Sequence, residues 1–169
     1  VKDFLNDYKD QVLAYIRAAV NAKIHYTSTV QKEILAQTKK ELEHKHSSKI
    51  IAIGASTGGV QVLEEILTNL QTNHPAIVIV QHMPTGFTAN FAKRLDGLSK
   101  TSLIVEAKEG QELQTNTVYI APGSKHIEIF KEGVYYVIRL KDFPKVDFHK
   151  PSATVLLSSV AKVASSNAV

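Results

Sequence analysis

The chain contains neither cysteine nor tryptophan among its 169 residues. Without cysteine there is no disulfide framework, no cysteine nucleophile and no thiolate metal site, which agrees with a reducing compartment. No run of about 18 apolar residues, the length that spans a bilayer, occurs in the sequence. The first residues do not form a signal-peptide pattern either. We therefore expect a cytoplasmic protein without membrane insertion.

Glycine and proline are absent from residues 1–45. Apolar residues recur there at helical intervals, at Phe4, Tyr8, Val12, Tyr15, Ile16 and Ala19. This pattern predicts an amphipathic helix without a core of its own. We assign residues 1–49 to a helical linker, and two interpretations stay open: a helix packed on the following domain, and a connection between two domains.

Acidic residues do not balance the basic ones, because 20 Lys and Arg against 16 Asp and Glu give a net charge of +4. Much of the excess lies in one stretch that also contains glutamates, at Lys39, Lys40, Lys45 and Lys49. We interpret this stretch as a solvated tether and expect no nucleic-acid partner. With 44% hydrophobic and 21% charged residues, the chain supports one compact core beside this arm.

The segment from Ile50 to Gly59 is an apolar run that ends in glycines around one serine. Gly54, Ser56 and Gly58 match the G-x-S-x-G pattern of a nucleophile elbow, a sharp strand-to-helix turn that presents the serine hydroxyl and leaves room only for small neighbours. Apolar residues then recur at helical spacing, at Val60, Leu63, Leu67 and Leu70. We predict a nucleophilic Ser56, with the backbone N–H of Thr57 directed at a developing oxyanion.

A glycine-rich turn between a strand and a helix also suits a phosphate. The G-x-x-x-x-G-K-[ST] pattern and a complete G-x-G-x-x-G pattern are both absent here, which weakens the nucleotide-binding interpretations. A purely structural turn and an anion cradle at Gly58-Gly59 remain alternatives to a catalytic serine.

A second apolar run, from Ala76 to Val80, ends on Gln81-His82-Met83-Pro84. The carboxyl ends of parallel strands share one edge of a sheet, and a right-handed crossover places consecutive strands side by side or nearly so. We therefore predict that His82 reaches the Ser56 hydroxyl as general base. The alternative is a histidine that caps the strand through a loop carbonyl.

The remaining patterns predict the rest of the fold. Strands are expected at Leu103-Ile104-Val105 and from Val118 to Gly123, with a helix between Phe87 and Leu98 and a last helix that contains Val155, Leu156, Val160 and Val163. Ile127 to Phe130 and Val134 to Ile138, joined by Lys131-Glu132-Gly133, predict an antiparallel hairpin. The fold class is α/β: a doubly wound, mostly parallel sheet in a Rossmann-like three-layer α/β/α arrangement, with an inserted antiparallel hairpin.

Met83, His126 and His149 are candidate residues of the cleft. Both histidines also fit a structural, hydrogen-bonded role. Two histidines at i and i+4 with a glutamate do not occur, so we expect no zinc site, no other metal and no cofactor.

Four motifs together resemble the chemotaxis protein-glutamate methylesterases of the CheB type, in the order found in that family. They are Gly54-Ala55-Ser56-Thr57-Gly58-Gly59, Gln81-His82-Met83-Pro84 followed by Gly86-Phe87-Thr88, Tyr119-Ile120-Ala121-Pro122-Gly123 with His126, and His149-Lys150-Pro151-Ser152. The resemblance covers residues 50–169. Two positions depart from it: Ala153-Thr154 replace a common Val-Asp pair, and Thr115-Asn116 replace a Pro-Gly turn, in which Asn still supplies a positive φ.

The resemblance implies hydrolysis of glutamyl methyl esters on methyl-accepting chemoreceptors, with release of methanol. The same acyl chemistry would allow deamidation of receptor glutamines. Ser56 is then the nucleophile, with Thr57 and His82 beside it. It also implies that residues 1–49 include the end of a receiver domain, through which a chemotaxis kinase acts, and that 50–169 are the catalytic domain. The alternative function is a noncatalytic module that binds an anionic ligand or a receptor segment at the glycine-rich turn.

The family's catalytic aspartate belongs to a Gly-Met-Gly-x-Asp-Gly stretch, which these 169 residues do not contain. The other aspartates of the domain region, Asp96, Asp142 and Asp147, do not match a known site. From the resemblance we therefore expect an incomplete triad, a catalytic domain that is incomplete at its C-terminal side, and impaired activity for this stretch of chain.

Overall fold

The computed structural model describes residues 13–14, 16–17, 20 and 44–169. The chain divides into two compact units, Val1–Gln31 and Lys32–Val169. In the first unit the described residues are helical and exposed: Leu13, Ala14, Ile16, Arg17 and Val20. Residues 44–49 of the predicted helical linker belong to the second unit and contain no helix, and the remaining residues of the linker lie outside the described ones.

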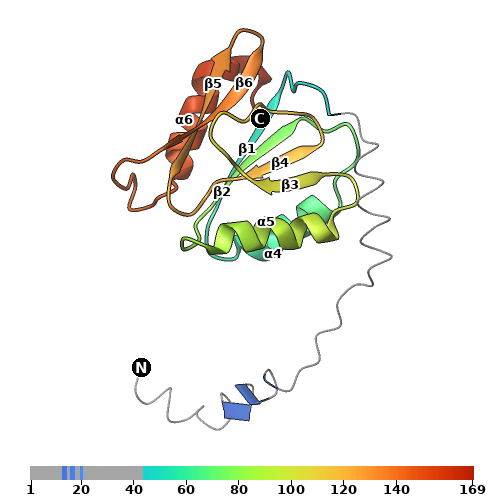
Figure 1. The fold of residues 1–169 in the computed structure, drawn as a ribbon, viewed down its shortest axis with the longest axis vertical. Coiled ribbons are helices and arrows are strands. Elements are labelled where there is room, and N and C mark those ends of the chain that lie inside the picture. Colours follow the sequence, from blue (N-terminus) through green and yellow to red (C-terminus); the bar gives the residue numbers. More distant parts are fainter. Residues whose placement is uncertain (1–12, 15, 18–19, 21–43) are drawn as a thin grey trace. The chain divides into compact units, whose positions relative to one another are not determined.

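The second unit contains a sheet of four parallel strands, β1 (Ile50–Ala55), β2 (Ala76–Gln81), β3 (Leu103–Glu106) and β4 (Thr117–Ile120) (Figure 1). Their order in the sheet is β1-β2-β4-β3. Consecutive strands β1 and β2 are neighbours, as the crossover rule predicts. Beside β1, Ala168 forms a parallel bridge to Ile50.

Two separate apolar layers cover the two faces of the sheet. The α-helices α4 (Gly59–Thr68) and α5 (Phe87–Leu98) lie on one face, while α6 (Ala153–Ala164), continued by a 3₁₀ turn at Ser165–Asn167, lies on the other with the hairpin (Figure 1). The alternation of side chains along β2 divides the core, because Val78 and Val80 point into the α6 layer and Ile77 and Ile79 into the α4 and α5 layer. This confirms the three-layer α/β fold that the sequence predicts.

The predicted hairpin is formed by β5 (His126–Glu132) and β6 (Tyr135–Lys141), which pair antiparallel. Glu132 pairs with Tyr135, so the turn consists of Gly133 and Val134 rather than Lys131-Glu132-Gly133. Gly133 has φ +61°, which a two-residue hairpin turn requires at its first position. The turn therefore lies where glycine can supply that φ.

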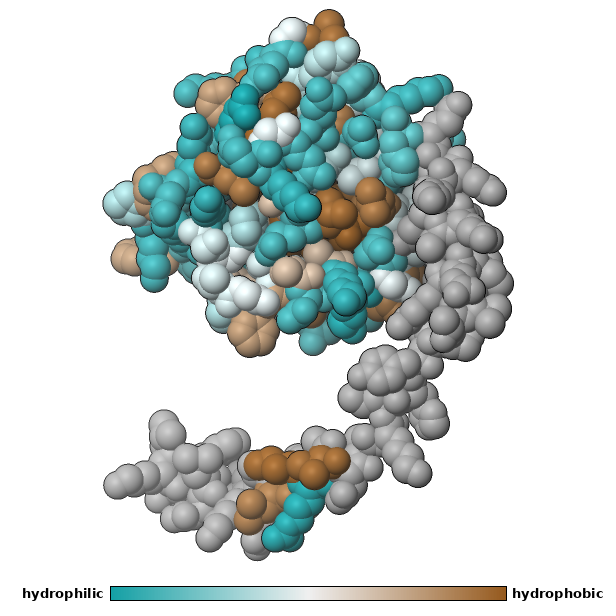
Figure 2. Space-filling model, viewed as in Figure 1, coloured by the Kyte–Doolittle hydropathy of each residue, from teal (hydrophilic) through white to brown (hydrophobic). Residues whose placement is uncertain are grey.

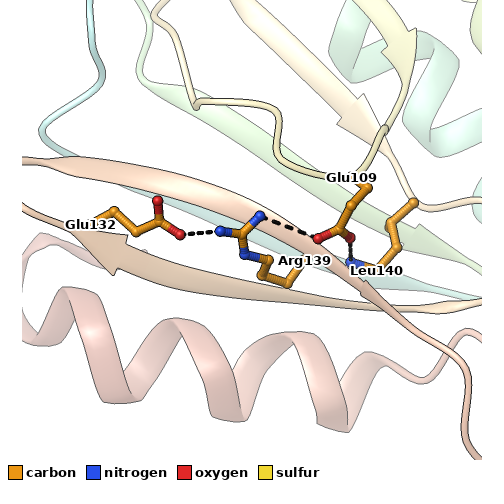
Figure 3. Close-up of polar contacts among 4 residues, drawn as sticks. All are labelled: Glu109, Glu132, Arg139 and Leu140. Atoms are coloured by element: carbon orange, nitrogen blue, oxygen red, sulfur yellow. Dashed lines mark hydrogen bonds and ion pairs between the residues drawn. The ribbon is translucent and has the colours of Figure 1, made fainter.

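The loop after β3 binds the outer edge of this hairpin. The Leu113 N–H donates to the Tyr136 carbonyl at 2.8 Å, and the Ile138 N–H donates to the Gln111 carbonyl at 2.8 Å. Figure 3 shows the side-chain part of this contact, in which Arg139 lies between Glu109 and Glu132. The Leu140 N–H donates to Glu109, and this bond, followed by the Arg139 guanidinium, lowers the pKa of the Glu109 carboxyl. The hairpin is thereby attached to the α/β core through its backbone and through charge.

Residues 44–49, which the charge pattern placed in a solvated tether, pack on the domain. The Ser47 side chain is buried, and its hydroxyl donates to the Lys49 carbonyl at 2.6 Å and accepts the Ala76 N–H at 2.8 Å. The Thr115 N–H donates to the Lys45 carbonyl at 2.8 Å. The Ser47 hydroxyl and backbone groups hold this segment, while Lys45 and Lys49 stay exposed, so the charge pattern gives no sign of the contact.

Asn116 has φ +57°, as expected for an asparagine in place of glycine. The face of the molecule in Figure 2 shows small hydrophobic patches within a mostly hydrophilic surface. Among the described residues, the helices are too short or too polar to span a membrane.

Candidate active site

Ser56 and His82 each follow the last paired residue of a neighbouring strand, because Ala55 pairs with Gln81 at the ends of β1 and β2. Their side chains therefore meet at the carboxyl edge of the sheet, where the Ser56 Oγ lies 3.2 Å from the His82 Nδ1. The backbone N–H of His82 also donates to the Ala55 carbonyl at 3.0 Å. The structure brings the two predicted residues within hydrogen-bond distance.

The glycines of the elbow are required for different reasons. A Cβ on Gly54 would lie 2.6 Å from the Cβ of Ala153, so close packing excludes a side chain there. Gly58 is open but has φ +81°, a conformation that L side chains rarely adopt. A Cβ on Gly59 would meet Ala55 at 2.8 Å. The close packing expected on both sides of Ser56 is thus found at Gly54 and Gly59. Gly58 is needed instead for the positive φ of the turn.

The buried side chain of Gln81 holds the backbone of the elbow at Ser56. Its side chain is 2% exposed, and its Nε2 donates to the Ser56 carbonyl at 3.0 Å. The Gly59 N–H donates to the same carbonyl at 2.9 Å and closes the turn. Two donors therefore fix the backbone of Ser56, so the hydroxyl is presented from a rigid position.

The second ring nitrogen of His82, Nε2, is buried and lacks a hydrogen-bond partner among the described residues. Burial lowers the pKa of His82 from 6.5, and the charge of nearby His149 lowers it further. Both effects favour the neutral imidazole. A neutral His82 can accept a proton from the Ser56 hydroxyl.

A cavity of about 270 Å³ opens beside this pair. Its lining includes His82, Met83, Lys145, Phe148, His149 and Lys150. Met83 and His149 therefore occupy the cleft for which the sequence made them candidates. A larger cavity of about 370 Å³ lies between β5 and α6, but Ser56 and His82 do not line it.

His149 lies directly against the base. Its ring stacks on the ring of His82, with centroids 3.7 Å apart and planes 8° apart. The contact, and the cavity lining by Lys145 and Phe148, were not predicted from sequence. They depend on the path of the 142–152 loop, for which the sequence has no periodic signal.

His126 does not line this cavity. Its side chain is fully buried, Nε2 donates to the Pro144 carbonyl at 3.1 Å, and Nδ1 accepts the Ser152 N–H at 3.2 Å. The ring also stacks on Phe143 with centroids 4.2 Å apart. With both nitrogens bonded, His126 holds the loop and the start of α6 together and leaves no atom for substrate.

The three aspartates of the domain are engaged away from His82. Asp96 accepts the Ile104 N–H, Asp142 pairs with Lys150, and Asp147 accepts the Thr154 hydroxyl. The described residues also contain no group of three or more histidine, aspartate or glutamate side chains suited to a metal ion.

Thr57 follows the serine and is exposed. Its backbone N–H has no acceptor within the described part of the chain. It lies one residue before Gly58, the N-cap of α4, where N–H groups are available to an anion.

Known proteins of one family are similar to this chain over most of its length. Residues 51–169 match the CheB methylesterase family model. The chain is 44% identical over 179 residues to protein-glutamate methylesterase/protein-glutamine glutaminase 3 of Leptospira interrogans, covering 99% of this chain and 50% of that protein. It is 40% identical over 170 residues to the protein-glutamate methylesterase/protein-glutamine glutaminase of Salmonella typhimurium, covering 100% of this chain and 47% of the relative.

The crystal structure of the Thermotoga maritima CheB methylesterase catalytic domain matches with a TM-score of 0.68 and 39% identity, over 71% of this chain and 64% of that one. The chain spans about half the length of the curated relatives it matches. Because the family model covers more than half of the residues and the relatives align over nearly all of them, the chain belongs to the CheB methylesterase family.

Proposed function

We propose that this chain acts as a serine hydrolase that removes methyl groups from glutamyl methyl esters on chemoreceptors, in the cytoplasm, and that it deamidates receptor glutamines by the same route. The observation that carries the proposal is the 3.2 Å contact between the Ser56 Oγ and the His82 Nδ1 at the carboxyl edge of the sheet. The names of the Leptospira and Salmonella relatives support the substrate class.

In the first half of the reaction, His82 takes the Ser56 proton on Nδ1 as the Ser56 oxygen attacks the ester carbonyl. The carbonyl oxygen becomes negative, and the Thr57 N–H is the candidate donor to it. The tetrahedral intermediate then collapses, the protonated imidazole gives its proton to the leaving oxygen, and methanol departs. A glutamyl ester of Ser56 remains.

In the second half of the reaction, a water molecule hydrolyses the glutamyl ester of Ser56. His82 takes a proton from the water, whose oxygen attacks the acyl carbonyl, and the Ser56 oxygen leaves with that proton. The product is a free glutamate. With a glutamine substrate the first leaving group is ammonia, and the acyl-enzyme is the same.

His82 needs Nδ1 free for this role, so its proton must lie on Nε2. That nitrogen is buried and unpaired among the described residues. A carboxylate at Nε2 would fix this tautomer and stabilise the protonated ring, the role of the acid in a Ser-His-Asp triad. Asp96, Asp142 and Asp147 are bonded elsewhere, so we propose that the acid is none of these three.

From the family resemblance we further propose chemoreceptors as the substrate partners. A receiver domain, through which a chemotaxis kinase acts, is the proposed regulatory partner.

The test is methanol release from chemoreceptors that carry labelled methyl esters, with the wild-type protein and Ser56→Ala compared. Release by the wild type alone, together with phosphonate labelling that Ser56→Ala abolishes, is the expected result. Anion binding at Gly58-Gly59 that survives Ser56→Ala, without methanol release by either protein, would support the noncatalytic binding module instead.

A further inference from the structure

The loop that carries His149 is closed by a tight turn. The Val146 N–H donates to the His149 carbonyl at 3.1 Å, and the His149 N–H donates to the Val146 carbonyl at 3.0 Å. The two residues between them, Asp147 and Phe148, have φ of +50° and +65°. Positive φ is uncommon in residues other than glycine, so this backbone conformation must be held in place by its surroundings.

The same turn fixes the imidazole of His149. The His149 Nδ1 lies 2.6 Å from the Asp147 carbonyl, to which it donates. The Asp147 carboxylate in turn accepts the Thr154 hydroxyl at 2.6 Å, which connects the turn to the first residues of α6. One hydrogen bond therefore fixes the His149 ring to the turn, and the Thr154 contact fixes the turn to α6.

We propose that His149 is a positioning residue, whose ring stacks on His82 and holds that imidazole in the orientation in which Nδ1 faces the Ser56 hydroxyl. The inference rests on the proposed function, because it assigns a role beside the proposed base. Its basis is geometric: ring planes 8° apart with centroids 3.7 Å apart leave His82 little freedom to rotate away from Ser56.

The stack also brings a second titratable ring against the base. A protonated His149 disfavours the protonation of His82, in the same direction as burial of His82. The other charged groups at this cavity are Lys145 and Lys150, and Lys150 is paired with Asp142.

Two substitutions separate orientation from charge. His149→Phe keeps a flat ring for the stack and removes the charge, whereas His149→Ala removes both. His46→Phe and His46→Ala are the matched controls, because His46 also contacts an aromatic ring, that of Tyr135 at 4.0 Å, and has no part in the site. All variants are made in the full chain.

The first measurement is kinetic. We expect His149→Ala to lower kcat by about tenfold or more with KM within about twofold, because a misplaced base slows the chemical step, and His149→Phe to stay within about threefold of the wild type. Both His46 variants should match the wild type. A kcat for His149→Ala within about twofold of the wild type, or an equal loss in His149→Ala and His149→Phe, would overturn the proposal.

The second measurement is an NMR titration of ¹⁵N-labelled imidazoles, with the His82 signals assigned by their loss in His82→Asn. His149→Phe should raise the pKa of His82, and an unchanged titration overturns the electrostatic part of the contact. This readout needs no substrate. If the wild type releases no methanol, the proposed function fails, while a raised pKa of His82 in His149→Phe still supports the stack.

Discussion

Gly54 in β1 packs against Ala153, the first residue of α6, with no room between them for a methyl group. A Cβ on Gly54 would lie 2.6 Å from the Ala153 Cβ. The contact links the strand that presents Ser56 to the helix that follows the His149 loop. The elbow and the loop therefore depend on each other through two small residues.

This relationship predicts that Gly54→Ala lowers the free energy of unfolding by about 1–3 kcal/mol, because overpacking shifts the start of α6. Ala153→Gly in the same chain should restore part of that loss, since it removes the opposing methyl. Urea denaturation of both single variants and the double variant measures the coupling. Gly97→Ala is the control, because a Cβ there meets nothing within 4 Å and helix α5 gains stability from alanine. Additive effects at Gly54 and Ala153 would contradict the packing argument.

The Ser56–His82 pair predicts non-additive losses of activity. Ser56→Ala and His82→Ala should each remove most methanol release, and the double variant should be little slower than either single one, because nucleophile and base act together. Initial rates on methylated receptor give the comparison. Near-full hydrolysis by His82→Ala would show that another group is the base.

Because Asp96, Asp142 and Asp147 are bonded to other groups, we predict that none of them is the acid of the triad. Asp96→Asn, Asp142→Asn and Asp147→Asn should each keep methanol release within about threefold of the wild type, whereas loss of a triad acid costs roughly 10⁴ in kcat. For the same reason, a polypeptide that carries the family's Gly-Met-Gly-x-Asp-Gly stretch should be much faster than these 169 residues. Equal rates with and without that stretch would show that the acid lies within them.

Because His74 is buried, we predict that the free energy of unfolding depends on pH. Burial lowers its pKa from 6.5, and its hydrogen bond to the Pro75 carbonyl only partly opposes this. In the folded state His74 thus binds its proton at a lower pH than in the unfolded state. The free energy of unfolding should therefore fall as the pH drops below about 6.5 toward the lowered pKa, with no contribution above that window.

The measurement for His74 is urea denaturation across this window for the wild type and His74→Gln. The variant should lose stability at neutral pH, because Ser102 loses its 2.7 Å contact with the ring, and should show a flatter decline on acidification. His46→Gln controls for the loss of a surface histidine. An identical pH slope in His74→Gln and the wild type would count against the role of His74.

Local patterns were sufficient to predict the sheet, the elbow and the meeting of Ser56 with His82. The reason is that parallel strands end on one edge, so two residues that follow neighbouring strands are brought together by strand order and register alone. The hairpin was predicted too, although its turn lies where Gly133 takes a positive φ.

Contacts that loops make with distant parts of the chain could not be predicted from local sequence patterns. His126 and His149 both belong to recognisable motifs, but one is enclosed by Pro144, Phe143 and Ser152 and the other lies on the base. The path of the 142–152 loop decides between these positions. Likewise, hydrogen bonds of the Ser47 hydroxyl and of the backbone at Ser47 and Lys45 hold a segment whose composition is typical of a tether.

The two apolar layers that β2 separates each support a different part of the site. Ser56 begins a turn into α4 on one side of the sheet, while His149 reaches the same edge from the loop before α6 on the other. The two apolar layers are packed separately, and close-packed interiors transmit displacement rather than absorb it. A sideways slip of the α6 layer over the sheet would move the His149 ring relative to the Ser56–His82 pair, which the sheet holds together, without unfolding either layer. Substitutions deep in the core, far from any substrate, can therefore tune the reaction as well as the stability.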